Sequence, residues 1–551
     1  MAAHPYHEAM SSPVPAGRCR RTVPARTAAA ALLLGAAAAT AAPAADKVTV
    51  TLPESAAALV RDGADTGRML LLFIRQGSRL GQADPLDAPF FTNPQPMASV
   101  AVPHLKPGRP VEFGADAVIF PEAFERFDGT YRVRAVFDRM TTEPGPAAPG
   151  NLTSEVAEVE FRADADDTIS VDLSRAIQPE ALPSIPNVEW VETPSELLSR
   201  AAGHEVKHRA AVVFPRQYGD VRAERRVWPA IYVIPGFGGD ARMAGSYARM
   251  MAVDGAQAVA PQAVYVVLDP NGPYGHHGFA DGDNQGPRAE ALVKEFIPWL
   301  EARYRLVARP EARIVTGHSS GGWSALWLQL THPETFGACF SSAPDPVDFS
   351  AFQASDLYTD ANVFVNGEGH PQPSFRAPLG PDYDRVFMTV PQEIAMERVL
   401  GPNGDSGQQW DAWAAMFSRK DPVTGFPRRM FDPMTGMINR DVVTEEWSRY
   451  DVARMVTGNW ATFGPIMRER VRLLCGTRDS FYLNRAVERL KEKLDALAAR
   501  DAAAGGPAAG QRGPGYVELV PDATHETLPA ISRLRWHREM TDHLKRHGLA
   551  P

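Results

Sequence analysis

A short motif with a serine at its centre is suited to nucleophilic chemistry. Residues 317–321 read Gly-His-Ser-Ser-Gly, which matches G-x-S-x-G with Ser319 in the middle. A serine hydroxyl is a poor nucleophile near neutral pH unless a base lies within hydrogen-bond reach and a carboxylate orients that base. The motif therefore predicts a nucleophilic Ser319 whose histidine and acid partners must lie elsewhere in the chain.

The flanks of the motif predict a sharp turn between a strand and a helix. Residues 314–315 end an apolar β-branched run, and an amphipathic run follows at 325–330. Strand, turn and helix are the context that a nucleophile elbow requires. We expect glycine at 317 and 321 because strand and helix pass too close together there for a side chain. The amide of Ser320, at the helix start, can then point at a developing oxyanion.

Asp479 and His525 are the partners that the later chain offers. Asp479 follows a predicted strand at 471–477, and His525 follows another at 516–520. In hydrolases with this elbow the partners come in the order Ser, Asp, His, each on a loop at the carboxyl end of a strand. Order and placement therefore predict Asp479 as the orienting acid and His525 as the base.

Other candidates fit these roles less well. His318 lies inside the elbow and points the wrong way for a base, while Asp345 only opens an irregular segment. His276 and His277 stand in a glycine-rich loop and are candidates for lining the substrate pocket. Three further histidines belong to a polar C-terminal helix, where we expect solvent exposure: His537, His543 and His547.

A second amide for the oxyanion is expected from the loop after an earlier strand. Residues 230–234 predict a buried strand, and Pro-Gly-Phe-Gly-Gly follows at 235–239. We therefore expect the amide of Phe237 to act together with that of Ser320. The sequence has no glycine-rich phosphate loop and no histidine, cysteine or acid cluster with metal-ligand spacing, so we expect no cofactor and no metal.

The first 44 residues predict a signal peptide. Arginines precede an apolar run at 28–39, and residues 42–44 read Ala-Pro-Ala, a small-residue cleavage site. The run is too short to span a bilayer. The Arg-Arg pair at 20–21 is a faint twin-arginine signal. We therefore expect a secreted or periplasmic protein with no stable membrane insertion after the signal is removed.

The mature chain divides by its periodicity into two domains. Residues 45–175 alternate with period 2 between Gly and Pro clusters, which predicts a β-sandwich, either a packing module or a carbohydrate-binding one. A proline-rich stretch at 176–195 predicts a linker. Strands alternating with helices over 196–551 predict a doubly wound α/β domain.

The α/β alternation breaks at about 345–465, which we expect to form a cap over the substrate pocket. Aromatic residues in such a cap more often build its own core than a platform for ligand. Three tryptophans of the cap and the elbow helix are nevertheless candidates for substrate binding: Trp323, Trp410 and Trp413.

Composition narrows the possible partners. The 551-residue chain has a net charge of −9 without long runs of one sign, so nothing suggests nucleic acid or an anionic membrane as a partner. Its three cysteines cannot form a disulfide framework, and Cys339 and Cys475 lie in apolar runs typical of buried thiols. The oligomeric state stays open.

Three segments and one histidine together resemble a known family: 235–239, 317–322, 475–479 and His525. They resemble the esterase D-type family of α/β-hydrolases, which includes enterochelin esterases, feruloyl esterases, S-formylglutathione hydrolases and mycolyltransferases. The resemblance covers about 206–547, apart from most of the cap. It implies an α/β-hydrolase fold and a serine esterase that forms an acyl-enzyme, with a small-molecule or carbohydrate ester as its expected partner. Ser320 stands where family members commonly have Met, and the large insertion is a further departure. Acyl transfer of the mycolyltransferase type and a non-catalytic carbohydrate-binding protein are the alternatives.

Overall fold

The computed structural model describes residues 47–549 apart from 61, 81, 88–92, 140–142, 163–167, 221–224, 254–258, 381–382 and 506–512. The predicted signal peptide lies outside these residues. Among the described helices, none combines the length and the apolar character needed to cross a bilayer.

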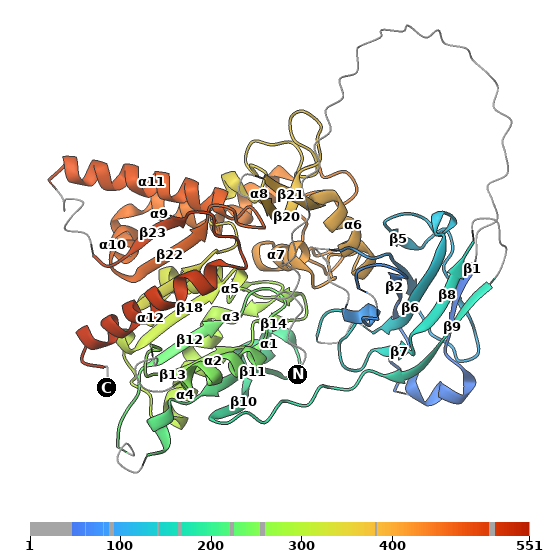
Figure 1. Cartoon of the computed structure of the whole chain (residues 1–551), viewed down its shortest axis with the longest axis horizontal. Helices are drawn as coiled ribbons and strands as arrows, with labels where there is room; N and C mark the ends of the chain where they lie inside the picture. The colour runs from blue at the N-terminus through green and yellow to red at the C-terminus, as the bar shows by residue number, and fades with distance from the viewer. Residues whose placement is uncertain are drawn as a thin grey trace, which may run out of the picture. The chain divides into compact units, whose positions relative to one another are not determined.

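The N-terminal part of the chain forms a nine-stranded sheet, coloured blue to cyan in Figure 1. Its strands are β1 (Lys47–Thr51), β2 (Gly67–Arg75), β3 (Met97–Val102), β4 (Val111–Glu112), β5 (Val118–Phe120), β6 (Gly129–Asp138), β7 (Leu152–Ser154), β8 (Ala157–Phe161) and β9 (Thr168–Ala176). Their order is β4-β1-β9-β7-β6-β2-β3-β5, with β8 paired to β6. Val50 of β1, Phe73 of β2 and Leu173 of β9 belong to one buried cluster, so strands far apart in this order enclose one core.

The stretch predicted as a linker is partly a strand. β10 (Val188–Ser195) pairs antiparallel with β11 (Val206–Val213) along its whole length. The prediction of a linker over 176–195 is therefore wrong for its second half. The local sequence is rich in proline and predicts a linker. The pairing with a strand from later in the chain cannot be predicted from these residues alone.

The rest of the chain builds a mixed eight-stranded sheet in the order β10-β11-β13-β12-β18-β19-β22-β23. Beyond the first two, its strands are β12 (Ala230–Ile234), β13 (Val264–Leu268), β18 (Arg313–His318), β19 (Ala338–Ser342), β22 (Val471–Gly476) and β23 (Tyr516–Val520). From β13 to β23 all neighbouring strands are parallel. Their carboxyl ends therefore meet at one edge, where the loops that follow them can form a site.

Helices alternate with these strands, as the periodicity predicts (Figure 1). They are α1 (Glu196–Ala202), α2 (Ala244–Met251), α3 (Arg288–Ala291), α4 (Ile297–Arg303), α5 (Ser320–Thr331), α11 (Asn484–Ala503) and α12 (Leu528–Arg546). A π-helical turn over 292–296 joins α3 to α4 just before Pro298, where a kink is predicted. Cys339 and Cys475 are buried free thiols, as expected.

The described residues between β19 and β22 form a hairpin and five α-helices. These are β20 (Pro373–Gly380), β21 (Tyr383–Thr389), α6 (Val390–Leu400), α7 (Gln409–Phe417), α8 (Arg440–Glu445), α9 (Val452–Gly458) and α10 (Trp460–Arg470). Trp410, Trp413 and Trp447 are at most 3% exposed and belong to the same apolar cluster as the sheet residues. The segment therefore shares its core with the sheet.

Two histidines of α12 are buried, although the polar sequence of the helix predicts exposure. His537 is 8% exposed and His543 is 4% exposed, and burial lowers the pKa of each to about 4. His543 Nε2 lies 2.9 Å from the carbonyl oxygen of Glu311. The expectation fails because both residues lie on a helix packed against the sheet, which residue polarity alone does not reveal.

Candidate active site

Ser319 occupies the sharp turn between β18 and α5. Its backbone has φ 59° and ψ −128°, a conformation that costs a residue with a side chain about 1–3 kcal/mol. The Ser319 amide donates to Ser342 O at 2.9 Å, and the Trp323 amide donates to Ser319 O at 3.0 Å. Such a turn persists only where the surrounding structure fixes it, and it is the geometry of a nucleophile elbow.

Glycines allow the close passage at this turn, as predicted. A Cβ added at Gly317 would lie 2.1 Å from the carbonyl oxygen of Gly321, and one at Gly321 would lie 2.0 Å from that of Ile234. Gly236, in the loop after β12, is less tightly confined, because an added Cβ would lie 2.9 Å from the carbonyl oxygen of His318 and 3.1 Å from Ser319 Cβ. The loop that is expected to supply the second oxyanion amide therefore lies directly beside Ser319.

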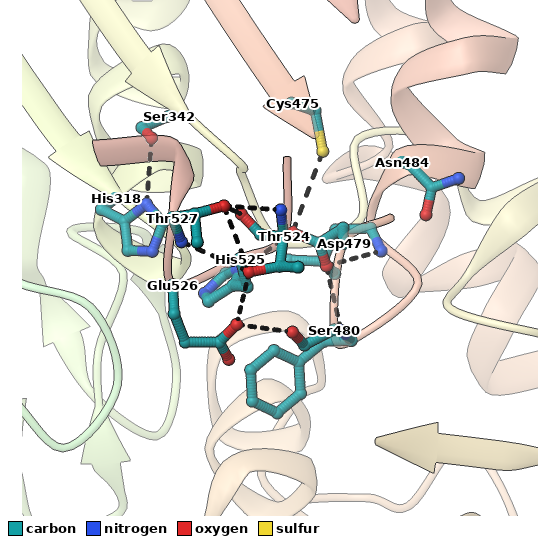
Figure 2. Close-up of polar contacts among 12 residues, drawn as sticks. His318, Ser342, Cys475, Asp479, Ser480, Asn484, Thr524, His525, Glu526 and Thr527 are labelled. Carbon is teal, nitrogen blue, oxygen red and sulfur yellow. Dashed lines mark hydrogen bonds and ion pairs between the residues drawn. The ribbon is translucent and has the colours of Figure 1, made fainter. Parts of the chain in front are cut away.

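Asp479 and His525 meet where the loops after β22 and β23 leave the sheet (Figure 2). His525 Nδ1 lies 2.8 Å from Asp479 Oδ2. Asp479 is fully buried, and its Oδ1 accepts hydrogen bonds from the amides of Phe481 and Leu483 at 3.0 and 3.2 Å. Because the carboxylate of Asp479 accepts at this contact, Nδ1 carries the proton, and in the neutral ring Nε2 keeps its lone pair. The structure thus brings the predicted acid and base together.

The surroundings of His525 favour its charged form. Burial lowers the pKa of His525, but the charge and hydrogen bond of Asp479 outweigh burial and raise this pKa above its usual value. The loop is held by Glu526, whose carboxylate accepts hydrogen bonds from Ser480 Oγ at 2.7 Å and Thr524 Oγ1 at 2.9 Å (Figure 2). An imidazole held this way is prepared to accept a proton.

His525 also lies beside the elbow. Its ring centroid is 4.3 Å from that of His318, the residue directly before Ser319. His318 Nδ1 lies 2.9 Å from Ser342 Oγ, and burial together with the charge of His525 holds the pKa of His318 well below its usual value. His318 is therefore a neutral packing partner, in line with its rejection as the base.

Asp345 is a buried carboxyl at the elbow with a different task from Asp479. Its Oδ2 accepts hydrogen bonds from Ser320 Oγ and Trp413 Nε1, both at 2.7 Å. Burial raises the pKa of Asp345 to about 6. Asp345 thus connects the start of α5 to α7. Sequence reasoning considered it only as a rival acid and missed this role, although its place just after β19 was visible.

Only one of the two predicted oxyanion amides is next to the serine in the chain, and the other belongs to the loop after β12. Ser320 begins α5 directly after Ser319, and its side chain is fully buried. Phe237 follows Gly236 in the loop that passes beside Ser319. The amide at a helix start and an amide from an earlier loop are the donors that a hydrolase elbow uses.

His276 supports this loop, which sequence reasoning did not predict. The Gly278 amide donates to His276 Nδ1 at 3.1 Å, so Nε2 carries the proton and donates to the carbonyl oxygen of Pro235 at 2.9 Å. Burial lowers the pKa of His276 to about 4 and keeps the ring neutral. The imidazole therefore fixes the backbone directly before Gly236. The glycine-rich pattern around His276 indicated only pocket lining.

The remaining candidates for substrate binding are buried side chains. His277, Trp323, Trp410 and Trp413 are each at most 3% exposed. Their burial favours packing, and a contact with substrate stays a prediction for all four. Among the described residues, no group of three or more His, Cys, Asp or Glu side chains is arranged to hold a metal ion.

Comparison with known proteins places this site in a family. Residues 201–493, more than half of the chain, match the family model described as "Putative esterase". The chain belongs to this esterase family. The matched range includes Ser319 and Asp479 and ends before His525.

Solved structures with a similar fold are hydrolases of low sequence identity. A ferulic acid esterase is 14% identical with a TM-score of 0.36, and the match covers 65% of this chain and 99% of that one. An S-formylglutathione hydrolase from Agrobacterium tumefaciens is 16% identical with a TM-score of 0.32, covering 66% and 98%. Fluorophosphonate-binding serine hydrolase F of Staphylococcus aureus is 10% identical with a TM-score of 0.34, covering 64% and 98%. No curated protein sequence matches the chain. These likenesses carry no argument about the substrate.

Proposed function

We propose that the chain is an exported serine hydrolase that cleaves a carboxylic ester through Ser319, His525 and Asp479. One observation carries the proposal: the 2.8 Å hydrogen bond from His525 Nδ1 to Asp479 Oδ2 lies beside the strained turn at Ser319. Membership in the esterase family supports the hydrolase class.

In the proposed acylation step, Ser319 Oγ attacks the ester carbonyl carbon while His525 Nε2 accepts the hydroxyl proton. Asp479 stabilises the imidazolium that forms. The amides of Phe237 and Ser320 donate hydrogen bonds to the oxyanion, where charge develops. The tetrahedral intermediate collapses when His525 returns the proton to the leaving alcohol, and the acyl group stays on Ser319.

Deacylation repeats these steps with water. His525 Nε2 takes a proton from water, the hydroxide attacks the acyl carbonyl, and the acid leaves as Ser319 regains its proton. Acyl transfer of the mycolyltransferase type would use a sugar hydroxyl in place of water. A non-catalytic carbohydrate-binding protein would carry out neither step.

The proposal extends to the domains and to the location of the protein. Residues 1–44 would direct export, the nine-stranded sheet would act as a separate β-sandwich domain, and the segment at about 345–465 would shape the substrate pocket as a cap. The enclosed core of the nine-stranded sheet supports its role as a separate domain. The position of the segment between β19 and β22, whose loops border the site, supports its role as a cap.

An esterase screen tests the function. Purified mature chain should hydrolyse at least one of a set of aryl, feruloyl, acetyl-sugar and siderophore esters. Ser319→Ala should abolish the activity. Ser324→Ala removes a buried serine of the same helix whose hydroxyl donates to the Ser320 carbonyl oxygen, and it should retain the activity. Product analysis with an added sugar acceptor separates hydrolysis from acyl transfer. Turnover by Ser319→Ala at the wild-type rate would contradict the proposal.

A further inference from the structure

A cavity lies outside the candidate active site. Its volume is about 360 Å³, within the range of small-molecule pockets. Its lining comes from α1, β11 and the residues just before β11, the end of β13, the segment over 271–288, Phe296 and Lys420. Ser319, Asp479 and His525 do not belong to the lining.

A buried cation forms part of the wall of this cavity. Arg288 is 9% exposed, and its Nε donates to the carbonyl oxygen of Gln285 at 2.7 Å. The other guanidinium N–H groups have no hydrogen-bond partner and no ion pair among the described residues. Asp269 acts on Arg288 through its charge, and its Oδ1 accepts hydrogen bonds from the backbone and side-chain amides of Asn271. Burial lowers the pKa of Arg288 to about 10, which leaves it charged at neutral pH.

An amide without a partner lies beside this guanidinium. A Cβ added at Gly272 would lie 2.7 Å from Gln285 Oε1 and 3.1 Å from Arg288 Nη2, so both groups face the same glycine. Gln285 is 5% exposed, and neither of its amide atoms has a hydrogen-bond partner among the described residues. Buried charges are normally paired and buried amides normally bonded, so this pair is incomplete without a further group.

The chemistry of that group follows from the donors. A planar guanidinium matches a carboxylate with two parallel hydrogen bonds. The Gln285 amide offers both a donor and an acceptor, which suits a hydroxyl next to the carboxylate. We infer that this cavity binds a small polyhydroxy carboxylic acid, with the carboxylate on Arg288 and a hydroxyl on Gln285.

The rim charges are mixed and do not select an anion by themselves. Lys207 is paired with Glu192, and Lys420 is exposed at the rim. Glu205, Asp269 and Asp283 add negative charge to the lining. The selection of a carboxylate therefore depends on the buried guanidinium, which sets the variants to be tested.

Isothermal titration calorimetry with the full mature chain tests this site, in a buffer free of carboxylate and phosphate. D-Gluconate should bind at one site with a dissociation constant of roughly 1 mM or tighter. Sorbitol, in which a CH2OH group replaces the carboxylate, should give no saturable heat. Absence of gluconate binding, or equal binding of sorbitol, overturns the inference. Tighter binding of inorganic phosphate than of gluconate overturns the assignment to a carboxylate.

Variants locate the binding. Arg288→Met and Gln285→Leu should each weaken gluconate binding at least tenfold without lowering the melting temperature of the ligand-free protein. Lys420→Met and Ser319→Ala should bind gluconate as the wild type does. If Arg288→Met does not fold, Gln285→Leu decides the question. Loss of binding in Ser319→Ala would place gluconate in the candidate active site and overturn the second site. An equal loss of gluconate binding in Lys420→Met would show that surface charge attracts the ligand, and it would overturn the inference.

Discussion

His525 donates a hydrogen bond from Nδ1 to Asp479 Oδ2 across 2.8 Å, although the two residues are 46 positions apart in the chain. The contact exists because β22 and β23 are parallel neighbours, paired from Arg472↔Tyr516 to Gly476↔Val520. Loops that leave two such strands at their carboxyl ends emerge at the same edge of the sheet. The position of the proposed base is therefore set by strand pairing.

Replacing the acid should disable the base without unfolding the protein. In Asp479→Asn the amide favours the wrong tautomer of His525, so we expect kcat to fall by about 10⁴. Asp345→Asn serves as the matched control, because an amide oxygen can still accept from Ser320 and Trp413, and its kcat should fall less than about tenfold. Steady-state hydrolysis of an aryl acetate, with circular dichroism of each variant, checks both. A larger loss in Asp345→Asn would identify Asp345 as the acid.

The activity should depend on pH through His525. The base must be neutral to accept a proton, and the pKa of His525 lies above its usual value of 6.5. As pH falls through this raised pKa the ring becomes charged and activity is lost. The acid limb of kcat/KM, which reports the free enzyme, should therefore have its midpoint above 6.5. A profile from about pH 5 to about pH 9 measures it, and a midpoint at or below 6.5 would contradict the assignment.

His276 should act on the rate through the oxyanion loop. His276→Leu removes the N–H that holds the Pro235 carbonyl at 2.9 Å. Since loss of one oxyanion donor costs about 10²–10³ in kcat, misplacement of the loop should cost roughly tenfold to a hundredfold, with a small change in KM. His276→Gln, which can still donate, should recover part of the loss. An unchanged kcat in His276→Leu, or equal losses in both variants, would show that the hydrogen bond does not position the loop.

The tryptophans of the segment between β19 and β22 should behave as core residues. Trp413 is 2% exposed, so Trp413→Ala should cost about 3–5 kcal/mol of unfolding free energy and lower activity on small and bulky esters together. Trp413→Phe should cost less, about 1–3 kcal/mol, mainly through the lost hydrogen bond to Asp345. Melting curves and KM for both ester sizes separate packing from substrate contact. A raised KM for the bulky ester alone, at an unchanged melting temperature, would instead show that Trp413 contacts the substrate.

Local pattern was enough to predict the elbow and the alternation of strands and helices in the α/β domain. Periodicity and glycine spacing predicted the turn at Ser319, and the order of strand ends pointed to Asp479 and His525. β10 was not predicted, because a proline-rich stretch does not reveal its pairing with β11. The roles of His276 and Asp345 were not predicted, because each depends on a hydrogen bond to a residue distant in the sequence. His276 bonds to Pro235, and Asp345 bonds to Trp413.

Covalent labelling of Ser319 tests the central proposal most directly. Only an activated serine attacks a fluorophosphonate quickly, so the wild-type chain should gain one adduct, mapped by peptide mass spectrometry to the peptide that contains Ser319. Ser319→Ala should remain unlabelled, and Ser324→Ala should be labelled like the wild type. Labelling that persists in Ser319→Ala, or a folded wild-type chain that takes up no probe, would contradict the proposal that Ser319 is an activated nucleophile.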